Sequence, residues 1–281
     1  MDHGLEERVG AGRRLVRSPA FLAPVALIFV LAAMAVSPEL FGAGDPFDCS
    51  LSRSLDGPRS GHPFGFDLQG CDYYTRVLNG ARSSLAVAVL VVVLTGLIGI
   101  VVGSLSAMRG GWVDAAVNQL TDVLLSVPLL LAAAFVMTLV GDRGVLEVVV
   151  GLTVLSWPPM TRLVRAEVRS LHSREYVDAA RALGAGKMRL LRRHILPNAI
   201  WPILAFAAGF TAIAVAAEAI LTFLGAGLEL PAISWGLMLA QARFRSVAAP
   251  HLLIPALFLS ATVAAFVFLS EACRRVFEAD D

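Results

Sequence analysis

Apolar residues along the chain fall into long runs that are separated by polar segments. A run of about 20 apolar residues is long enough for an α-helix to cross the hydrocarbon core of a bilayer. The pattern therefore predicts an all-α membrane protein with six transmembrane helices. Their expected bounds are residues 19–41, 83–107, 116–140, 145–163, 199–224 and 251–270.

Two of these runs carry further signals. In the fourth run, Trp157-Pro158-Pro159 predicts a break, because prolines leave helix carbonyls without partners. In the second run, Gly99 and Gly103 form a small-xxx-small pair that suits close helix packing.

The polar segments set the expected organisation of the chain. It comprises a cytoplasmic N-terminal tail (1–18), the first transmembrane helix (19–41), an extracytoplasmic loop (42–81), a core with five transmembrane helices (82–271) that contains a polar loop (165–197), and a cytoplasmic C-terminal tail (272–281). The 42–81 loop has too few apolar residues for a core of its own, and we expect it to end in a short interfacial helix. The first run, with its basic flank and Ala33-Met34-Ala35, also fits a cleaved signal peptide. We expect a retained helix, because five more runs follow.

Composition and charge support this topology. Apolar residues make up 57% of the chain and the mean hydropathy is +0.73, values too high for a soluble domain of 281 residues. A net charge of +1 gives no basis for nucleic-acid binding. With six helices and an inward N-terminus, 16 of the 23 basic residues lie inside and seven outside. The positive-inside rule therefore places both termini and residues 165–197 in the cytoplasm.

A polar island, residues 175–197, lies between two apolar runs. On a helix over 175–183, Tyr176, Ala179, Ala180 and Leu183 form one apolar stripe, and Gly184 is expected to end that helix in the left-handed conformation. A short exposed helix of this kind suits docking into another protein. The alternative is a basic loop that only orients the chain.

A second helical piece is expected after Gly186. Met188, Leu191 and Ile195 would lie on one side of it, and Pro197 is expected to close it.

The island resembles the signature loop of ATP-binding-cassette importer permeases, a Glu-Ala-Ala triplet followed by Gly and a distal Leu-Pro. Here the loop reads Asp178-Ala179-Ala180, Gly184 and Leu196-Pro197. Asp178 replaces the usual Glu, and His194 stands where Ile is frequent.

Two further segments resemble the dipeptide, oligopeptide and nickel permeases of that family. The first runs from His62-Pro63-Phe64-Gly65, through Asp67 and Arg76, to Gly80-Ala81-Arg82-Ser83-Ser84-Leu85. The second joins Phe223-Leu224-Gly225-Ala226-Gly227 to Pro231-Ala232-Ile233-Ser234-Trp235-Gly236. Departures are Phe66 at a Thr and Cys71 at an Arg.

The resemblance implies a permease subunit with the importer core fold, in the cell membrane of a bacterium. Implied partners are a second homologous permease, two ATPase subunits that bind ATP and Mg, an extracytoplasmic solute-binding protein and the lipid bilayer. The cargo would be peptides, or nickel chelates as the other option within the family. The residues expected to contact an ATPase are Glu175, Tyr176, Asp178, Ala179, Ala180, Arg181, Gly184 and Ala185.

Catalytic chemistry is not indicated. Gly184-Ala185-Gly186-Lys187 is no phosphate-binding loop, since Arg181 and Met188 occupy positions that need Gly and Ser or Thr. The five histidines have no ligand spacing, so we expect no metal site and no cofactor bound by this chain.

Two acids within predicted helices are candidates for a substrate path, since charges in a bilayer usually face a bundle interior or a wet cavity. Glu218 either lines such a path or is a hydrogen-bonded packing residue. Asp122 either lines it or pairs with an arginine. An ion-coupled secondary transporter or channel is the alternative function, but it should show an acidic relay or inverted halves.

Cysteine placement predicts a disulfide between Cys49 and Cys71. Both fall in the loop expected outside, where disulfides persist, whereas Cys273 is expected at the inner end of the last helix. The alternative is that each cysteine is a small core filler.

Overall fold

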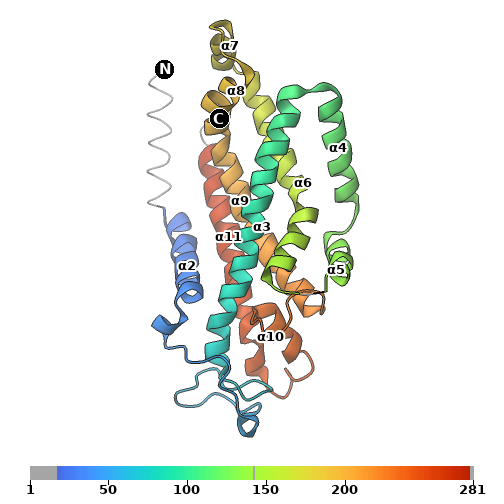
Figure 1. Cartoon of the computed structure of the whole chain (residues 1–281). Helices are drawn as coiled ribbons and strands as arrows, with labels where there is room; N and C mark the ends of the chain where they lie inside the picture. The colour runs from blue at the N-terminus through green and yellow to red at the C-terminus, as the bar shows by residue number, and fades with distance from the viewer. Residues whose placement is uncertain (1–17, 142, 279–281) are drawn as a thin grey trace.

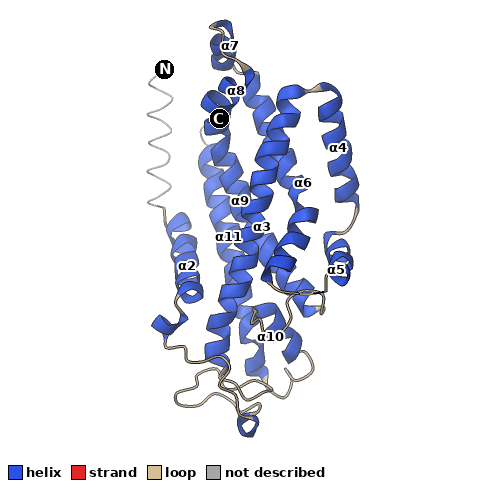
Figure 2. Ribbon diagram, viewed as in Figure 1, coloured by secondary structure: helices blue, strands red, loops and turns tan. Residues whose placement is uncertain are grey.

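The computed structural model describes residues 18–141 and 143–278, and every regular element in these ranges is a helix (Figure 2). The predicted tails, 1–18 and 272–281, lie largely or partly outside the described residues. The α-helices are α2 (Pro19–Val36), α3 (Tyr73–Arg109), α4 (Gly111–Ser126), α5 (Leu129–Leu139), α6 (Val145–His172), α7 (Glu175–Ala182), α8 (Lys187–Leu190), α9 (Leu196–Phe223), α10 (Trp235–Ala242) and α11 (Ile254–Glu278). Short 3₁₀ turns cover Pro38–Phe41, Leu51–Arg53 and Pro250–Leu253, and a π-helical turn, η3, covers Leu191–Ile195.

The long helices form an elongated bundle (Figure 1). α3 packs along α6 and α9, while α11 packs on α9 and α2. α7 lies at one end of the bundle, and α10 lies with the 42–72 loop at the other (Figure 1). The bundle thus presents two separate ends on which partners could act.

Helix α2 runs along the edge of the bundle, where Arg82 of α3 fastens its end. The Arg82 guanidinium donates to the carbonyls of Ala35 and Val36, both at 3.2 Å. These carbonyls have no partner within their own helix, and a cation at this position also interacts favourably with the negative end of the helix dipole. One side chain therefore ties the first helix to the core.

In the part of the chain that the structure describes, four helices are long and apolar enough to cross a membrane: Pro19–Val36, Tyr73–Arg109, Lys187–Phe223 and Pro250–Arg275. Helices α4 and α5 add a fifth candidate if this bent pair is one span. Helix α6 occupies the place of the predicted fourth span but is not one of these candidates. The all-helical membrane fold is thus confirmed, whereas the count of six spans stays a prediction.

The predicted third span, 116–140, is bent. Its two halves, α4 and α5, meet at 88°. The break lies at Val127, which is extended (φ −92°, ψ 129°), and Pro128. A proline disfavours the helical conformation of the residue before it, so the chain turns here.

The predicted break at Trp157-Pro158-Pro159 is wrong, because α6 continues through both prolines. Close packing against α3 supports this stretch. A Cβ added to Gly99 would lie 2.5 Å from Met160 Cγ, and one added to Gly103 would lie 2.7 Å from Thr161 O. The glycine pair therefore packs within the chain, where neighbouring helices can hold a proline-containing helix in place.

Two further helix ends differ from the predictions. Pro197 does not close a helix: α8, η3 and α9 follow one another directly, and Pro197 sits in the first turn of α9, where a proline is tolerated. α3 begins at Tyr73, because Asp72 caps it by accepting from Thr75 N at 3.0 Å. The helix expected at the end of the 42–81 loop is therefore present, but it is the first part of α3 and not a separate short helix.

Candidate functional site

The signature loop forms a separate small helix, α7, at the end of the bundle (Figure 1). Leu183 follows it, and Gly184 takes the left-handed conformation (φ +86°). Gly184 N donates to Arg181 O at 2.9 Å, and Ala185 N donates to Ala180 O at 3.1 Å. This pair of hydrogen bonds is the Schellman motif, which ends helices at a glycine. The predicted left-handed cap at Gly184 is confirmed.

The predicted apolar stripe faces outward. Leu183 is 90% exposed and Tyr176 is 42% exposed, while Ala179 is exposed and Ala180 half-buried. Alanines between two large apolar side chains leave the α7 backbone accessible to a partner surface. The stripe therefore has the shape that docking requires.

Val177 anchors α7 to the bundle, and sequence reasoning missed it. It is fully buried and packs in a cluster with Val164 and Val168 of α6 and with Leu190 and Ile195 beneath α7. The only signal was an apolar residue off the stripe in a short polar helix.

The prediction of which residues share one side of the second helical piece, after Gly186, is partly wrong. Of the three residues predicted on one side, Ile195 is buried and Leu191 is half-buried, but Met188 is 59% exposed and Leu190 is buried instead. The π turn changes the spacing of this piece from that of a regular α-helix. The apolar cluster under α7 thus joins it to α6 and to α9.

The charged residues of α7 lie on its surface. Glu175 and Asp178 fall in the first turn, where the helix dipole favours anions. Arg181 donates to Asp178 at 2.8 Å and lies beside His172. Exposed pairs of this kind add about 0–1 kcal/mol of stability, so these side chains are available to a partner.

Asp122 of α4 pairs with Arg162 of α6, and pairing with an arginine is one of the two roles predicted for it. A stronger connection nearby was missed: Arg165 donates to Asp114 through two nitrogens at 2.5 and 2.7 Å, and Ser106 donates to the same carboxylate at 2.6 Å. These contacts tie α4 to α3 and α6. Whether Asp122 meets a substrate stays a prediction.

Glu218 of α9 is fully buried within the chain. Thr222 donates to its Oε1 at 3.0 Å, and no described residue makes a hydrogen bond to Oε2 within ordinary geometric limits. The packing alternative fits these contacts within the single chain. Its role in a substrate path stays a prediction.

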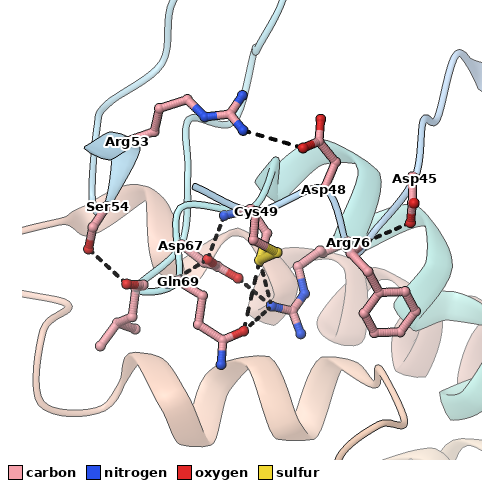
Figure 3. The surroundings of a disulfide bond; sticks show 11 residues. Asp45, Asp48, Cys49, Arg53, Ser54, Asp67, Gln69 and Arg76 are labelled. Carbon is pink, nitrogen blue, oxygen red and sulfur yellow. Dashed lines mark hydrogen bonds and ion pairs between the residues drawn. A yellow bond between two sulfur atoms is a disulfide. The ribbon is translucent and has the colours of Figure 1, made fainter. Parts of the chain in front are cut away.

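The loop at the opposite end is closed by Cys49 and Cys71, whose sulfurs are bonded at 1.99 Å with Cα atoms 4.0 Å apart. Figure 3 shows Arg76 beneath the sulfurs. Arg76 donates to Asp67 at 2.5 Å and to Gln69 at 3.2 Å. The Asp67 carboxylate also accepts from the backbone N–H groups of Gln69 and Cys71. A buried ion pair therefore lies directly under the disulfide.

Non-reducing peptide mapping of the purified protein is expected to recover one linked pair, Cys49 with Cys71, and a free thiol at Cys273, which is half-buried. Reduction should destabilise the closed loop by about 3 kcal/mol in the chain-entropy model, seen as faster protease cleavage within residues 50–70. Cys273→Ser is the control and should leave the linked peptide unchanged. Free thiols at both loop cysteines would contradict this prediction.

Within residues 18–141 and 143–278, no cluster of three or more His, Cys, Asp or Glu side chains is placed to hold a metal ion.

Comparison with known proteins agrees with this geometry. Residues 99–280 match the family described as binding-protein-dependent transport system inner membrane component. A glutathione transport system permease protein of Pectobacterium atrosepticum is 35% identical over 266 residues, which is 93% of this chain and 87% of the relative. The dipeptide transport system permease protein of Bacillus subtilis is 34% identical over 267 residues, 94% of this chain and 83% of the relative.

A solved structure gives the same fold. The MetNI methionine ABC transporter, in an inward-facing conformation, superposes with a TM-score of 0.57 at 25% identity, covering 73% of this chain and 96% of that chain. The family match spans more than half of the chain, and the relatives exceed 30% identity over nearly all of it. The chain therefore belongs to the binding-protein-dependent transport system inner membrane component family and is the permease subunit of an ATP-binding-cassette importer.

Proposed function

We propose that this permease carries peptides and forms one half of a heterodimeric pore with a second, homologous permease. The cargo assignment is supported by its relatives, which are named for glutathione, dipeptide and oligopeptide transport. All three cargoes are short peptides. An extracytoplasmic solute-binding protein would deliver the cargo, and two ATPase subunits would bind ATP and Mg and hydrolyse the nucleotide. The chain itself would not act on ATP.

The observation that carries the coupling role is the exposed stripe of α7 over its buried anchor, Val177. In this proposal the apolar stripe of α7 enters a cleft of an ATPase subunit; its residues are Tyr176, Ala179, Ala180 and Leu183. The polar residues Glu175, Asp178 and Arg181 would border the contact, and Gly184 with Ala185 would form its end. Closure of the ATPases would move α7, and the apolar cluster beneath it would pass that movement to α6 and α9. The helices would then rock between inward-open and outward-open states.

The proposed orientation puts α7 and both termini in the cytoplasm of a bacterium. The support is the nine basic residues between Arg162 and Arg193, opposed by three acids, which the positive-inside rule assigns to the cytoplasmic side. The loop with the disulfide then lies outside, where such bonds persist.

The test is uptake by proteoliposomes that hold the complete importer, supplied with the loaded binding protein. We expect labelled di- and tripeptides to accumulate only when ATP is inside with the ATPases. A nickel chelate that accumulates while peptides do not would overturn the cargo assignment. Peptide uptake driven by an ion gradient without ATP would overturn the coupling.

A further inference from the structure

At the end of the bundle opposite α7, the chain folds back on itself between α9 and α10 (Figure 1). α10 packs closely on its neighbours: a Cβ on Gly236 would lie 2.8 Å from Ala219 Cα, and one on Gly80 would lie 3.2 Å from Trp235 Cδ1. Trp235 is fully buried and donates from its ring nitrogen to Val77 O at 3.0 Å. The return segment (224–234) and α10 are therefore seated against α3 and α9.

Three buried hydroxyls hold backbone N–H groups of this region. Thr222 accepts from Leu228 N at 3.1 Å. Ser84 accepts from Trp235 N and Ser234 from Leu237 N, both at 3.2 Å. A hydroxyl that accepts in this way still has its one proton to donate. The three hydroxyls come from α3, α9 and the residue before α10.

The side chain of Glu218 faces all three hydroxyls. Thr222 donates to it at 3.0 Å, and the hydroxyls of Ser84 and Ser234 also interact with the carboxyl. The two serine hydroxyls thus lie beside the carboxyl without a regular hydrogen bond to it, and among the described residues Oε2 has no hydrogen-bond partner. A carboxylate only accepts hydrogen bonds, so it is the group that suits three converging donors. One continuous chain of hydrogen bonds runs from Leu228 N through Thr222 to Glu218. The Ser84 and Ser234 hydroxyls, which hold Trp235 N and Leu237 N, lie beside the same carboxyl.

We propose that Glu218 is a positioning residue that fastens the return segment and α10 to α3 and α9, and thereby fixes the outer end of the transport path. Glu218 acts through the three hydroxyls and does not contact cargo. The transport role of this fastening rests on the proposed function, whereas the fastening itself does not.

Hydrogen exchange tests the proposal on the assembled importer in nanodiscs. Glu218→Gln puts amide donors in front of the hydroxyls, and Thr222→Val removes one hydroxyl at nearly constant volume. Each variant is expected to speed exchange in peptides covering 226–238 by about tenfold, the effect of losing one buried hydrogen bond. Thr222→Ser keeps the hydroxyl and should restore slow exchange.

Thr153→Val is the matched control. Thr153 is also buried, but its hydroxyl makes no hydrogen bond within the described part of the chain, so exchange near α10 should not change. A second readout separates positioning from general damage. Glu218→Gln should reduce the stimulation of ATP hydrolysis by the loaded binding protein several-fold and leave basal hydrolysis unchanged, because α7 is untouched.

Unchanged exchange in both Glu218→Gln and Thr222→Val would overturn the proposal, as would Thr222→Ser behaving like Thr222→Val. Faster exchange with normal stimulation by the binding protein would support the fastening but overturn its role in transport, since α10 would then be loosened without effect on the importer. If the wild-type importer takes up no peptide, the proposed cargo fails, but the exchange measurements still decide whether Glu218 fastens α10.

Discussion

Replacing Gly184 with tryptophan is expected to reduce ATP-driven uptake to background while the protein still inserts into the membrane. Gly184 is exposed, and a Cβ added there meets no atom within 4 Å, so the side chain would project into the space that the ATPase is proposed to occupy. Its φ of +86° adds strain of about 1–2 kcal/mol for a residue other than glycine. The measurements are uptake, and copurification of the ATPases with the membrane complex.

Gly42→Trp is the matched control for that substitution. Gly42 has nearly the same φ, +78°, and equally open surroundings, but it lies in the loop at the opposite end of the bundle. This variant carries the same strain and should keep uptake within about twofold of wild type, because strain of about 1–2 kcal/mol at one surface residue does not unfold a stable domain. Full uptake by a well-expressed Gly184→Trp variant would disprove the docking of α7.

Replacing Arg76 with methionine is expected to destabilise the 42–72 loop strongly. Arg76 and Asp67 are 2% and 3% exposed, and the substitution would leave the Asp67 carboxylate buried without its counter-charge. Breaking a buried pair in this way costs about 3–5 kcal/mol. Protease cleavage of the 42–72 loop should rise by a factor on the order of 10²–10⁴ when cleavage follows the population of the opened loop.

The same substitution at Arg53 provides the control. Arg53 pairs with Asp48 at 3.7 Å in the same loop, but the Asp48 side chain is 76% exposed. An exposed pair contributes about 0–1 kcal/mol, so cleavage should rise less than about tenfold. The double variant Asp67→Asn with Arg76→Met removes both charges and should be cleaved more slowly than Arg76→Met alone. Equal cleavage of the Arg53 and Arg76 variants would show that the ion pair does not hold the loop.

Local patterns in the sequence were sufficient where one helix face or one glycine decides the structure. The apolar stripe of α7 and the cap at Gly184 depend on residues within one helix and its next turn, so periodicity and glycine preference predict them. The long apolar runs likewise predict helices, because backbone groups in a bilayer must be satisfied within the segment.

Prolines were less informative, since the same residue has opposite outcomes in this fold. Pro128 accompanies a bend of 88°, Pro158 lies inside a continuous helix, and Pro197 sits in a first helical turn. What decides between these outcomes is packing by residues far along the chain, such as Gly99 and Gly103 against α6.

Contacts between distant residues were not predictable from one sequence. Ser84 and Trp235 are 151 positions apart, and Arg165 and Asp114 are 51 apart. Hydroxyls and arginines of this kind are common throughout the chain, and only the folded arrangement selects the few that meet.

The π turn between α8 and α9 has a geometric consequence for how this permease tolerates insertions and deletions. A π turn closes its hydrogen bond one residue later than an α turn, so Leu191–Ile195 holds one residue more than a regular helix needs. Removing that residue should let the turn close as a regular α-helix, with α7 and α9 still facing as they do now. One further residue inserted here would instead rotate everything before the turn by about 100° about the helix axis. The π turn therefore makes a one-residue deletion tolerable at this place, whereas an insertion would change the direction in which α7 faces.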